Sequence, residues 1–204
     1  MSAPPSSESS EIQLEVSDSE RELFQVLVAA ASSLPQLSGA PDAPPPTVRI
    51  VGGWVRDRLL SSPWYASRCA VPPPASSASY DVDVALSSCT GLRFAEGVVA
   101  HLRSVRPGDV PHVGVVSANP DKSKHLETAT CRLYGFECDF VNLREEEYAD
   151  GADHRVPTEV RFGTPAEDAA RRDFTVNALF YRLATDGSGG GTVEDWTGRG
   201  LADM

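Results

Sequence analysis

Several features that would assign the chain to a special class of protein are missing from its sequence. No apolar run reaches the length of about 20 residues that a helix needs to cross a membrane. The first residues are mainly serine, proline and glutamate, without the basic start and apolar core of a signal peptide or the arginines of an organelle transit peptide. We therefore expect an intracellular protein that does not act in a membrane, and the sequence leaves open a cytoplasmic, nuclear or mitochondrial location.

Cysteine patterns typical of metal sites are also missing. The four cysteines, Cys69, Cys89, Cys131 and Cys138, have neither a CxxC spacing nor a nearby pair of histidines. Zinc sites and small disulfide frameworks depend on such spacings. The pattern therefore favours free, mostly buried thiols in a reducing compartment.

Positive charge is scarce. The chain has 18 Lys and Arg against 29 Asp and Glu, a net charge of −11, whereas nucleic-acid-binding domains normally present basic surface. Residues 1–47 hold seven acidic residues and one arginine, so part of the excess is local. The charge argues against a large RNA footprint on this chain.

The composition divides the chain into segments. Its 204 residues suffice for one domain with tails. Residues 1–16 are predicted to form a disordered acidic Ser/Pro tail. Residues 17–46 are predicted to comprise a helix, which Ser19 and Glu22 would start with a capping box, and then a proline-rich linker. Residues 61–79, rich in proline and serine, are predicted to be a flexible insertion.

Residues 80–86 organise the rest of the chain. Apolar side chains alternate there with Asp81, Asp83 and Ala85, which predicts a half-buried strand with both carboxylates on one face. Two carboxylates beside an apolar layer are costly unless a cation offsets their charge. A divalent metal would do so and would suit phosphoryl or nucleotidyl transfer. Solvated acids on an exposed strand are the alternative.

A second candidate site lies upstream. Residues 47–51 are a strand candidate, Gly52 and Gly53 follow, and residues 54–60 read as a helix. A strand, a Gly-Gly turn and a helix can cradle phosphate, because glycine lets the backbone approach closely and the helix N-terminus offers free N–H groups. Arg56, in the first turn, could reach a phosphate oxygen. A plain tight turn is the alternative.

A third acidic segment lies downstream. Residues 128–133 and 135–143 are predicted to form a hairpin, with Glu137 and Asp139 on one face of its second strand. Strand register decides which of them meets the first two aspartates. Further strands are expected at residues 113–116 and 192–195, a helix at 91–102 and a loop at 145–155.

Residues 164–167 (Thr-Pro-Ala-Glu) are a strong helix start, with threonine as the cap, proline at the first helical position and glutamate closing a capping box. The helix is predicted to continue to Phe180. At helical spacing, Asp168 could pair with Arg172, and Asp173 and Asn177 would share one face of the helix.

Together these segments resemble the catalytic head of the tRNA nucleotidyltransferase (CCA-adding enzyme) and poly(A) polymerase family, in the class II form that bacteria and eukaryotes share. The resemblance covers about residues 48–204, rests on the number and order of the segments, and is closest to eukaryotic CCA-adding enzymes. The matching segments are residues 52–57, 81–83, 124–130, 139–144, 163–168, 171–179 and 195–201.

The resemblance implies an α/β (α+β) fold of the nucleotidyltransferase superfamily, with a mixed sheet of about five strands flanked by helices. It implies a head domain at residues 47–192 and the start of a head–neck hinge at 193–204. The neck that selects the incoming base, and the body and tail that hold tRNA, would then be absent from this chain.

The resemblance also implies roles for single residues. Asp81 and Asp83 would bind Mg²⁺, and Asp139, which it aligns with an acidic position of the family, would be the third catalytic carboxylate in preference to Glu137. The residues implied in nucleotide binding are Gly52, Gly53, Arg56, Arg172, Asp173 and Asn177.

The implied reaction is the template-independent addition of CMP and AMP, from CTP and ATP, to the 3′ end of tRNA by two-metal catalysis. The tRNA would be held mainly by regions missing from this chain. Two alternatives remain: the head of a poly(A) polymerase, and a non-catalytic subunit that binds nucleotide or RNA. The complete set of site residues argues against the second.

Overall fold

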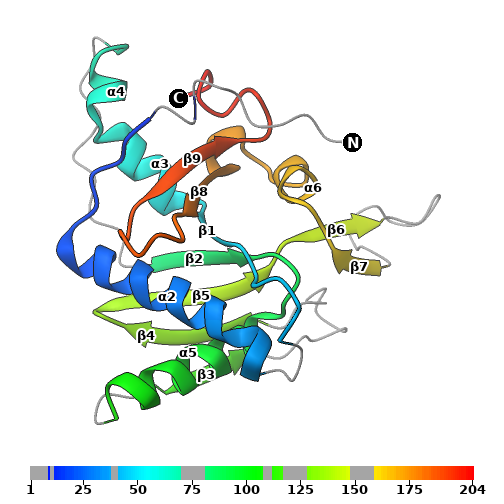
Figure 1. Cartoon of the computed structure of the whole chain (residues 1–204). Coiled ribbons are helices and arrows are strands. Elements are labelled where there is room, and N and C mark those ends of the chain that lie inside the picture. Colours follow the sequence, from blue (N-terminus) through cyan, green and yellow to red (C-terminus); the bar gives the residue numbers. More distant parts are fainter. Residues whose placement is uncertain are drawn as a thin grey trace.

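The computed structural model of the chain describes residue 9 and residues 12–37, 41–69, 81–107, 112–116, 128–147 and 159–204. These residues form a mixed seven-stranded sheet, helices that pack on it, and a separate two-stranded sheet (Figure 1). The predicted mixed sheet flanked by helices is confirmed, although it has seven strands where about five were expected. None of the helices in the described ranges is long and apolar enough to cross a membrane.

The main sheet has the strand order β3-β4-β5-β2-β1-β8-β9. Its strands are β1 (Val48–Val51), β2 (Asp81–Leu86), β3 (Val113–Val116), β4 (Thr128–Leu133), β5 (Phe136–Asn142), β8 (Leu179–Leu183) and β9 (Gly191–Asp195). The central neighbours β2 and β5 are parallel, whereas the other adjacent pairs are antiparallel. The two acidic segments of the sequence therefore lie side by side in the middle of the sheet.

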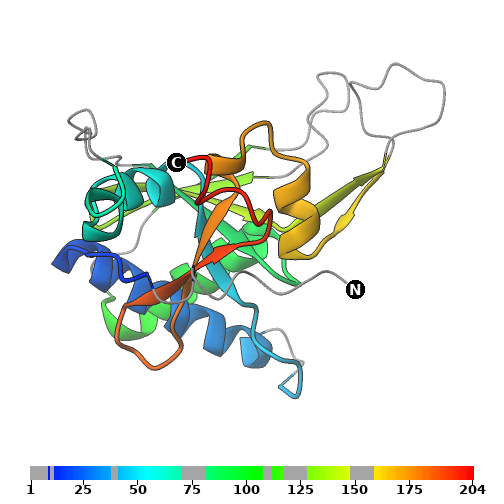
Figure 2. The same ribbon diagram turned by 90° about the horizontal axis from the view of Figure 1, so that it is seen from above.

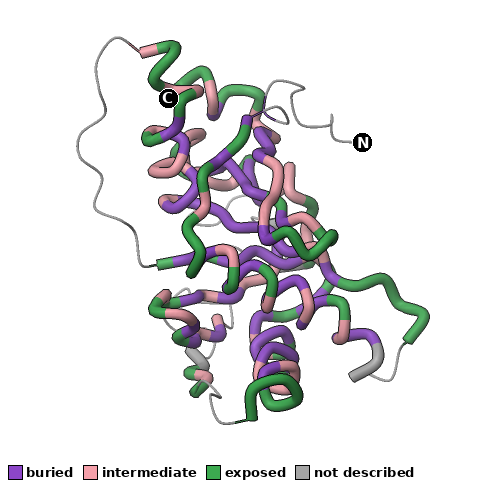
Figure 3. Tube along the Cα trace, turned by 60° about the vertical axis from the view of Figure 1, so that its left-hand side comes forward, coloured by how far each residue is buried: buried purple, intermediate pink, exposed green. Residues whose placement is uncertain are grey.

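The two faces of the main sheet are covered differently. The helices are α2 (Asp18–Leu37), α3 (Gly53–Leu60), α4 (Pro63–Ala66), α5 (Gly91–Val105), α6 (Pro165–Ala170) and the 3₁₀ turn η2 (Thr175–Asn177). α2 and α5 cover one face, and the opposite face, which carries α6, is called the open face below. α2 and α5 pack against each other and enclose the main apolar core on the face that they cover. Figure 3 shows buried positions along the central strands. On the other face α6 packs on a smaller cluster around Val51, Ala85 and Phe180.

α2 begins with a capping box two residues earlier than predicted. The hydroxyl of Ser17 accepts the N–H of Glu20 at 3.3 Å, and the Glu20 carboxylate accepts the N–H of Ser17 at 2.7 Å. Ser19 and Glu22 were the predicted pair. The earlier pair prevails because Glu20 is completely buried and also binds side chains of α3, which no local pattern in the sequence reports.

The N-terminal segment packs more closely than predicted. Residues 12–16, assigned to a disordered tail, are described, and Ile12 and Leu14 are 3% and 8% exposed in the main core. The average composition of the tail concealed their alternation with polar residues. α2 also continues to Leu37, into the predicted linker, and Leu34 packs so closely on α5 that a side chain at Gly97 would come within 3.2 Å of it.

The prediction that the helix beginning near Thr164 continues to Phe180 is wrong. α6 ends at Ala170, the backbone of Phe174 is extended (φ −128°, ψ 130°), and η2 and then β8 follow. Asp173 and Thr175 are weak helix formers. β8 pairs with both β1 and β9, so tertiary pairing overrides any local helical preference.

Two further segments differ from the predictions. The predicted loop at 145–155 begins with strand β6 (Arg144–Glu147), which pairs with β7 (Glu159–Phe162) and projects from one end of the main sheet (Figure 2). The predicted flexible insertion at 61–79 begins with α4, whose cap Ser62 accepts the N–H of Tyr65. Residues 70–80 and 124–127 lie outside the described residues.

The end of the chain continues the main sheet. Residues 193–195, predicted to begin the hinge, belong to β9, which pairs with β8. The Asp195 carboxylate then accepts N–H groups of Thr197, Gly198 and Leu201 at 3.0–3.1 Å. This turn closes residues 195–201 into a compact loop.

Candidate active site

β2 presents two carboxylates on the open face of the sheet. Val82 and Val84 are buried in the main core, while Asp81 and Asp83 point to the opposite side and are solvent-accessible. The predicted strand and its alternation are confirmed. A segment that is apolar on one side thus anchors two acids at a defined position beside its neighbouring strands.

The parallel register of β2 and β5 adds two more carboxylates to that face. Asp83 is level with Asp139, and Asp81 is level with Glu137. Asp139 is also held from the other side, because the Thr130 hydroxyl on β4 donates to its Oδ1 at 2.5 Å. Asp139 is therefore an oriented acid next to Asp83, whereas Glu137 is exposed near the hairpin turn.

The clustered acids affect one another. Although Asp83 reaches solvent, the surrounding protein desolvates its carboxylate and raises its pKa, and the negative charges of Asp139 and Asp81 raise it further. The positive charge of Arg172 acts in the opposite direction and lowers it. This end of the open face therefore carries crowded negative charge that a bound cation would offset.

The backbone of the Gly-Gly turn lies against this cluster. Gly52 follows β1 and has a positive φ of 78°, and a Cβ there would lie 3.0 Å from Oδ2 of Asp83. Glycine is required for both reasons, since a side chain would be strained and would crowd the carboxylate. α3 starts at the next residue, Gly53, so its free N–H groups lie close to the acids.

Arg56 of α3 is held at the edge of the same region. Its Nε donates to Oδ1 of Asp57 at 2.8 Å, and one terminal nitrogen donates to Oδ1 of Asn177 at 2.9 Å. The Arg56 side chain is still 36% exposed. Two of the predicted nucleotide-binding residues, Arg56 and Asn177, are thus brought together from α3 and η2.

Arg172 approaches from the end of α6. Its Nε and a terminal nitrogen donate to Oδ2 of Asp168 at 3.1 and 2.9 Å, so the predicted pairing is confirmed. Its guanidinium also lies 5.8 Å from the centre of the Phe180 ring, within the range of a cation–π contact. Asp168 is a buried member of this region that was not assigned to the site from the sequence.

The remaining predicted residue, Asp173, is exposed in the turn between α6 and η2. The expectation that Asp173 and Asn177 share a helical face is wrong, because the chain between them is not α-helical. Phe174, beside Asp173, is 64% exposed. Both side chains are therefore exposed to solvent in this turn.

The carboxylates of this site can be compared with the ligands that Mg²⁺ usually takes in proteins. In the part of the chain that the structure describes, no three His, Cys, Asp or Glu side chains converge closely enough to hold a metal ion unaided. Mg²⁺ usually takes one or two protein carboxylates and completes its coordination with water and substrate phosphates. The carboxylate oxygens of Asp81 and Asp83 fit that requirement.

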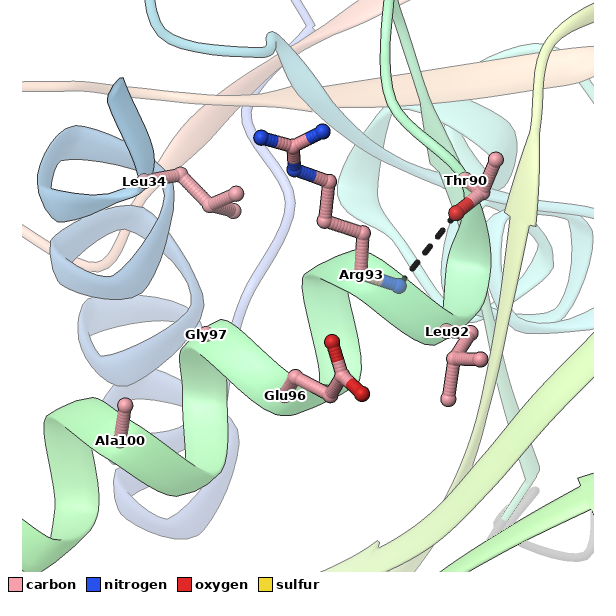
Figure 4. Close-up of a pocket in the computed structure, with 7 residues that line it drawn as sticks. All are labelled: Leu34, Thr90, Leu92, Arg93, Glu96, Gly97 and Ala100. Carbon is pink, nitrogen blue, oxygen red and sulfur yellow. Dashed lines mark hydrogen bonds between the residues drawn. The ribbon is translucent and has the colours of Figure 1, made fainter. Parts of the chain in front are cut away.

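A cavity of about 600 Å³ lies on the other side of the molecule between α2 and α5. Leu34 of α2 and Arg93 and Gly97 of α5 line it (Figure 4), and Thr90 caps α5 there by accepting the N–H of Arg93 at 3.3 Å. α2 and α5 cover the face opposite the carboxylates. This cavity is therefore separate from the candidate active site.

The comparison with protein families shows which family this chain belongs to. Residues 48–204 match the model of the poly A polymerase head domain. The chain belongs to that family. The resemblance drawn from the sequence is therefore confirmed.

Curated relatives are longer than this chain. tRNA nucleotidyltransferase cca1 of Schizosaccharomyces pombe is 39% identical over 191 residues, which are 94% of this chain and 33% of that protein. The mitochondrial CCA tRNA nucleotidyltransferase of Saccharomyces cerevisiae is 45% identical over 163 residues, which are 78% of this chain and 26% of that protein. The chain thus spans about a third or less of their length.

A solved structure of a CCA-adding enzyme, apo form II, has the same fold. It superposes with a TM-score of 0.57 at 23% identity, over 92% of this chain and 34% of that one. The fold is therefore that of the nucleotidyltransferase head, as predicted.

Proposed function

We propose that the chain is the catalytic head of a template-independent RNA nucleotidyltransferase that adds CMP and AMP, from CTP and ATP, to the 3′ end of tRNA. The observation that carries this proposal is the register of β2 and β5, which sets Asp139 beside Asp83, the carboxylate that lies against the turn at Gly52. The substrates are inferred from the names of the curated relatives, which are tRNA and CCA tRNA nucleotidyltransferases.

The triphosphate is proposed to bind between the Gly-Gly turn and the two arginines. Gly52 and Gly53 would offer backbone N–H groups, and Arg56 and Arg172 would neutralise phosphate charge from opposite sides. Asn177 supports Arg56 through its 2.9 Å hydrogen bond. Asp173, exposed in the turn between α6 and η2, is proposed to accept a ribose hydroxyl.

Asp81 and Asp83 are proposed to hold Mg²⁺. When bound, magnesium neutralises developing phosphate charge and makes the attacking 3′-hydroxyl easier to deprotonate. Asp139 is the third carboxylate of the proposal, and Thr130 fixes its orientation. The hydroxyl oxygen attacks the α-phosphorus, the bond to pyrophosphate breaks, and the hydroxyl proton passes to a carboxylate of the site.

The decisive experiment replaces one carboxylate at a time. Asp81→Asn and Asp83→Asn should each abolish incorporation of labelled AMP into tRNA that lacks its terminal CCA, in this chain or in a longer protein that contains it. Thermal stability without metal should hold or rise, since each change relieves the charge crowding that raises the pKa of Asp83. Asp186→Asn, in the exposed turn after β8, is the control. Measurable incorporation by either site variant would contradict the assignment.

The family description favours a second candidate, the head of a poly(A) polymerase. The two functions differ in product. Incubation with ATP and CTP would yield a CCA end in the first case, whereas ATP alone would yield a long adenosine tail in the second. Sequencing of the extended RNA distinguishes them, and a lack of any extension would favour a binding subunit.

A further inference from the structure

Asp168 lies just outside the proposed triphosphate site and touches two arginines. We propose that Asp168 is a positioning residue that directs the guanidinium of Arg172 toward the nucleotide phosphates. This inference rests on the proposed function, because it assigns a purpose to Arg172 that depends on nucleotide binding. It concerns a residue without a direct role in the proposed reaction.

The contact between the two side chains is specific. Asp168 is 1% exposed, and its Oδ2 accepts both Nε and a terminal nitrogen of Arg172 at 3.1 and 2.9 Å. Its Oδ1 accepts the same two donors of Arg171 at 2.9 and 2.5 Å. Each arginine therefore has one edge of its guanidinium bound to the carboxylate, so its plane and direction are defined.

The helix start holds Asp168 in place. The Thr164 hydroxyl accepts the N–H of Glu167 at 3.3 Å, the Glu167 carboxylate accepts the N–H of Thr164 at 2.6 Å, and the Asp168 N–H bonds to the Thr164 carbonyl at 3.0 Å. α6 ends two residues later. The arginines that follow leave the helix and fold back on a carboxylate that is already fixed.

The other contacts of Arg172 give its direction. Its guanidinium lies over the Phe180 ring of β8 at 5.8 Å, and its charge acts on Asp83. A long arginine side chain loses considerable rotamer freedom when it binds a ligand. Because Asp168 and Phe180 already restrict Arg172, that loss occurs on folding, and the phosphates meet a pre-oriented cation.

Asparagine at position 168 would remove this control with little change of volume. An amide has one acceptor oxygen and one donor NH₂ group. In either orientation, one of the two arginines would face a donor in place of an acceptor. The carboxylate charge between the two guanidiniums would also disappear.

The chain contains a matched control for the burial of a carboxylate between two arginines. Glu194 on β9 is 4% exposed and accepts Arg49 at 2.8 Å and Arg182 at 2.9 Å. This cluster also lies on the open face but does not include a residue of the proposed phosphate site. Glu194→Gln should therefore lower stability without a selective effect on triphosphate.

The test measures the affinity of the 204-residue chain for ATP and for AMP in Mg²⁺. Asp168→Asn should weaken ATP binding about 10- to 100-fold, the range typical of outer residues that orient ligand-binding groups. AMP binding should change much less. In the double variant with Arg172→Ala, Asp168→Asn should have little further effect, since both changes remove the same contact.

If Asp168→Asn does not fold, the inference can still be tested by a measurement on the wild-type chain. The Nε–H signal of Arg172 in an NMR spectrum should show slow exchange with water and should shift on addition of ATP, whereas that of Arg182 should not shift. Equal loss of ATP and AMP binding, additive double-variant effects or an unaffected Arg172 signal would each overturn the inference. A wild-type chain that binds no ATP would instead refute the proposed function and, with it, this inference.

Discussion

At the scale of single residues, burial in the main core determines the reactivity expected of the cysteines. Cys131 on β4 and Cys138 on β5 are paired across the strands and are 2% and 0% exposed on the side of the main core. The predicted free state is confirmed for all four cysteines. Burial raises the pKa of Cys131 to about 12 and that of Cys89 to about 11, and it raises the pKa of Cys138 as well.

These values predict the outcome of thiol labelling. The thiolate is the reactive form, so buried thiols with raised pKa values react slowly. A disulfide reagent at pH 8 should modify one of the four cysteines of the native chain rapidly, Cys69, which is partly exposed. All four should react in urea. A Cys69→Ser variant should lose the fast phase, and rapid reaction of Cys131 or Cys138 would contradict the packing of β4 and β5.

Much of the candidate site follows from the sequence at this scale. Strict alternation identifies Asp81 and Asp83, and a Gly-Gly turn before a helix identifies Gly52 as a point of close approach. Helical spacing also predicts the pairing of Asp168 with Arg172, but it does not predict that Asp168 is buried and binds Arg171 as well. The hydrogen bond of Thr130 to Asp139 could not be predicted in the same way, because it requires the strand register.

At the scale of elements, the junction of α2 and α3 depends on one buried carboxylate. Glu20 accepts the indole N–H of Trp54 at 2.8 Å and also binds Arg58, in addition to the Ser17 groups that cap α2. Burial alone would raise the pKa of Glu20, but the hydrogen bonds from Ser17, Trp54 and Arg58 lower it below 4.5. The helix that carries Arg56 is thus tied to the N-terminal helix.

Glu20→Gln should therefore lower the free energy of unfolding by about 1.5–3 kcal/mol at pH 7, the range for hydrogen bonds to a charged group. A group with a lowered pKa in the folded state contributes stability above its unfolded value of 4.5 and loses it as pH falls through the folded value. The difference between wild type and variant should hence shrink below pH 4.5 in urea titrations.

The matched change is Glu22→Gln, since this side chain is 54% exposed and lies 3.9 Å from Arg106. It should alter stability by less than about 0.5 kcal/mol, as exposed ion pairs do. If both variants lost the same stability at every pH, the junction at Glu20 would not have the proposed importance.

Elements with a local signal could be predicted from the sequence, and elements without one could not. The cap at Thr164 and the alternation in β2 are local, and both are observed. β6 contains three consecutive glutamates and is a strand only because β7 pairs with it. β8 pairs with β9, which is close in sequence, and with β1, which is far away in sequence. No local pattern around β8 indicates the pairing with β1.

At the scale of the whole molecule, the proposed nucleotide site consists of groups that would contact phosphate and ribose. Under that proposal, Gly53, Arg56 and Arg172 would bind groups that all four nucleoside triphosphates share. Selection of a base requires polar groups that the wrong base would leave unpaired. We therefore expect the 204-residue chain to bind ATP, CTP, GTP and UTP with affinities that differ by less than about tenfold, or 1.4 kcal/mol.

Titration of the purified chain with each nucleotide in Mg²⁺ checks this expectation. Arg56→Ala serves as the control, because it should weaken binding of all four to the same extent. A clear preference for ATP and CTP over GTP and UTP would mean that base recognition lies within these residues.

The parallel pairing of β2 and β5 has a consequence for how the molecule folds. Parallel neighbours cannot be joined by a tight turn, and here α5, β3 and β4 intervene along the chain. Asp83 and Asp139 consequently meet through a contact of high sequence separation, the kind that slows folding. A ligand that touches both strands together with α3 and Arg172 would bind only the completed fold. By mass action it would then reduce the population of partly unfolded chains that proteases cut.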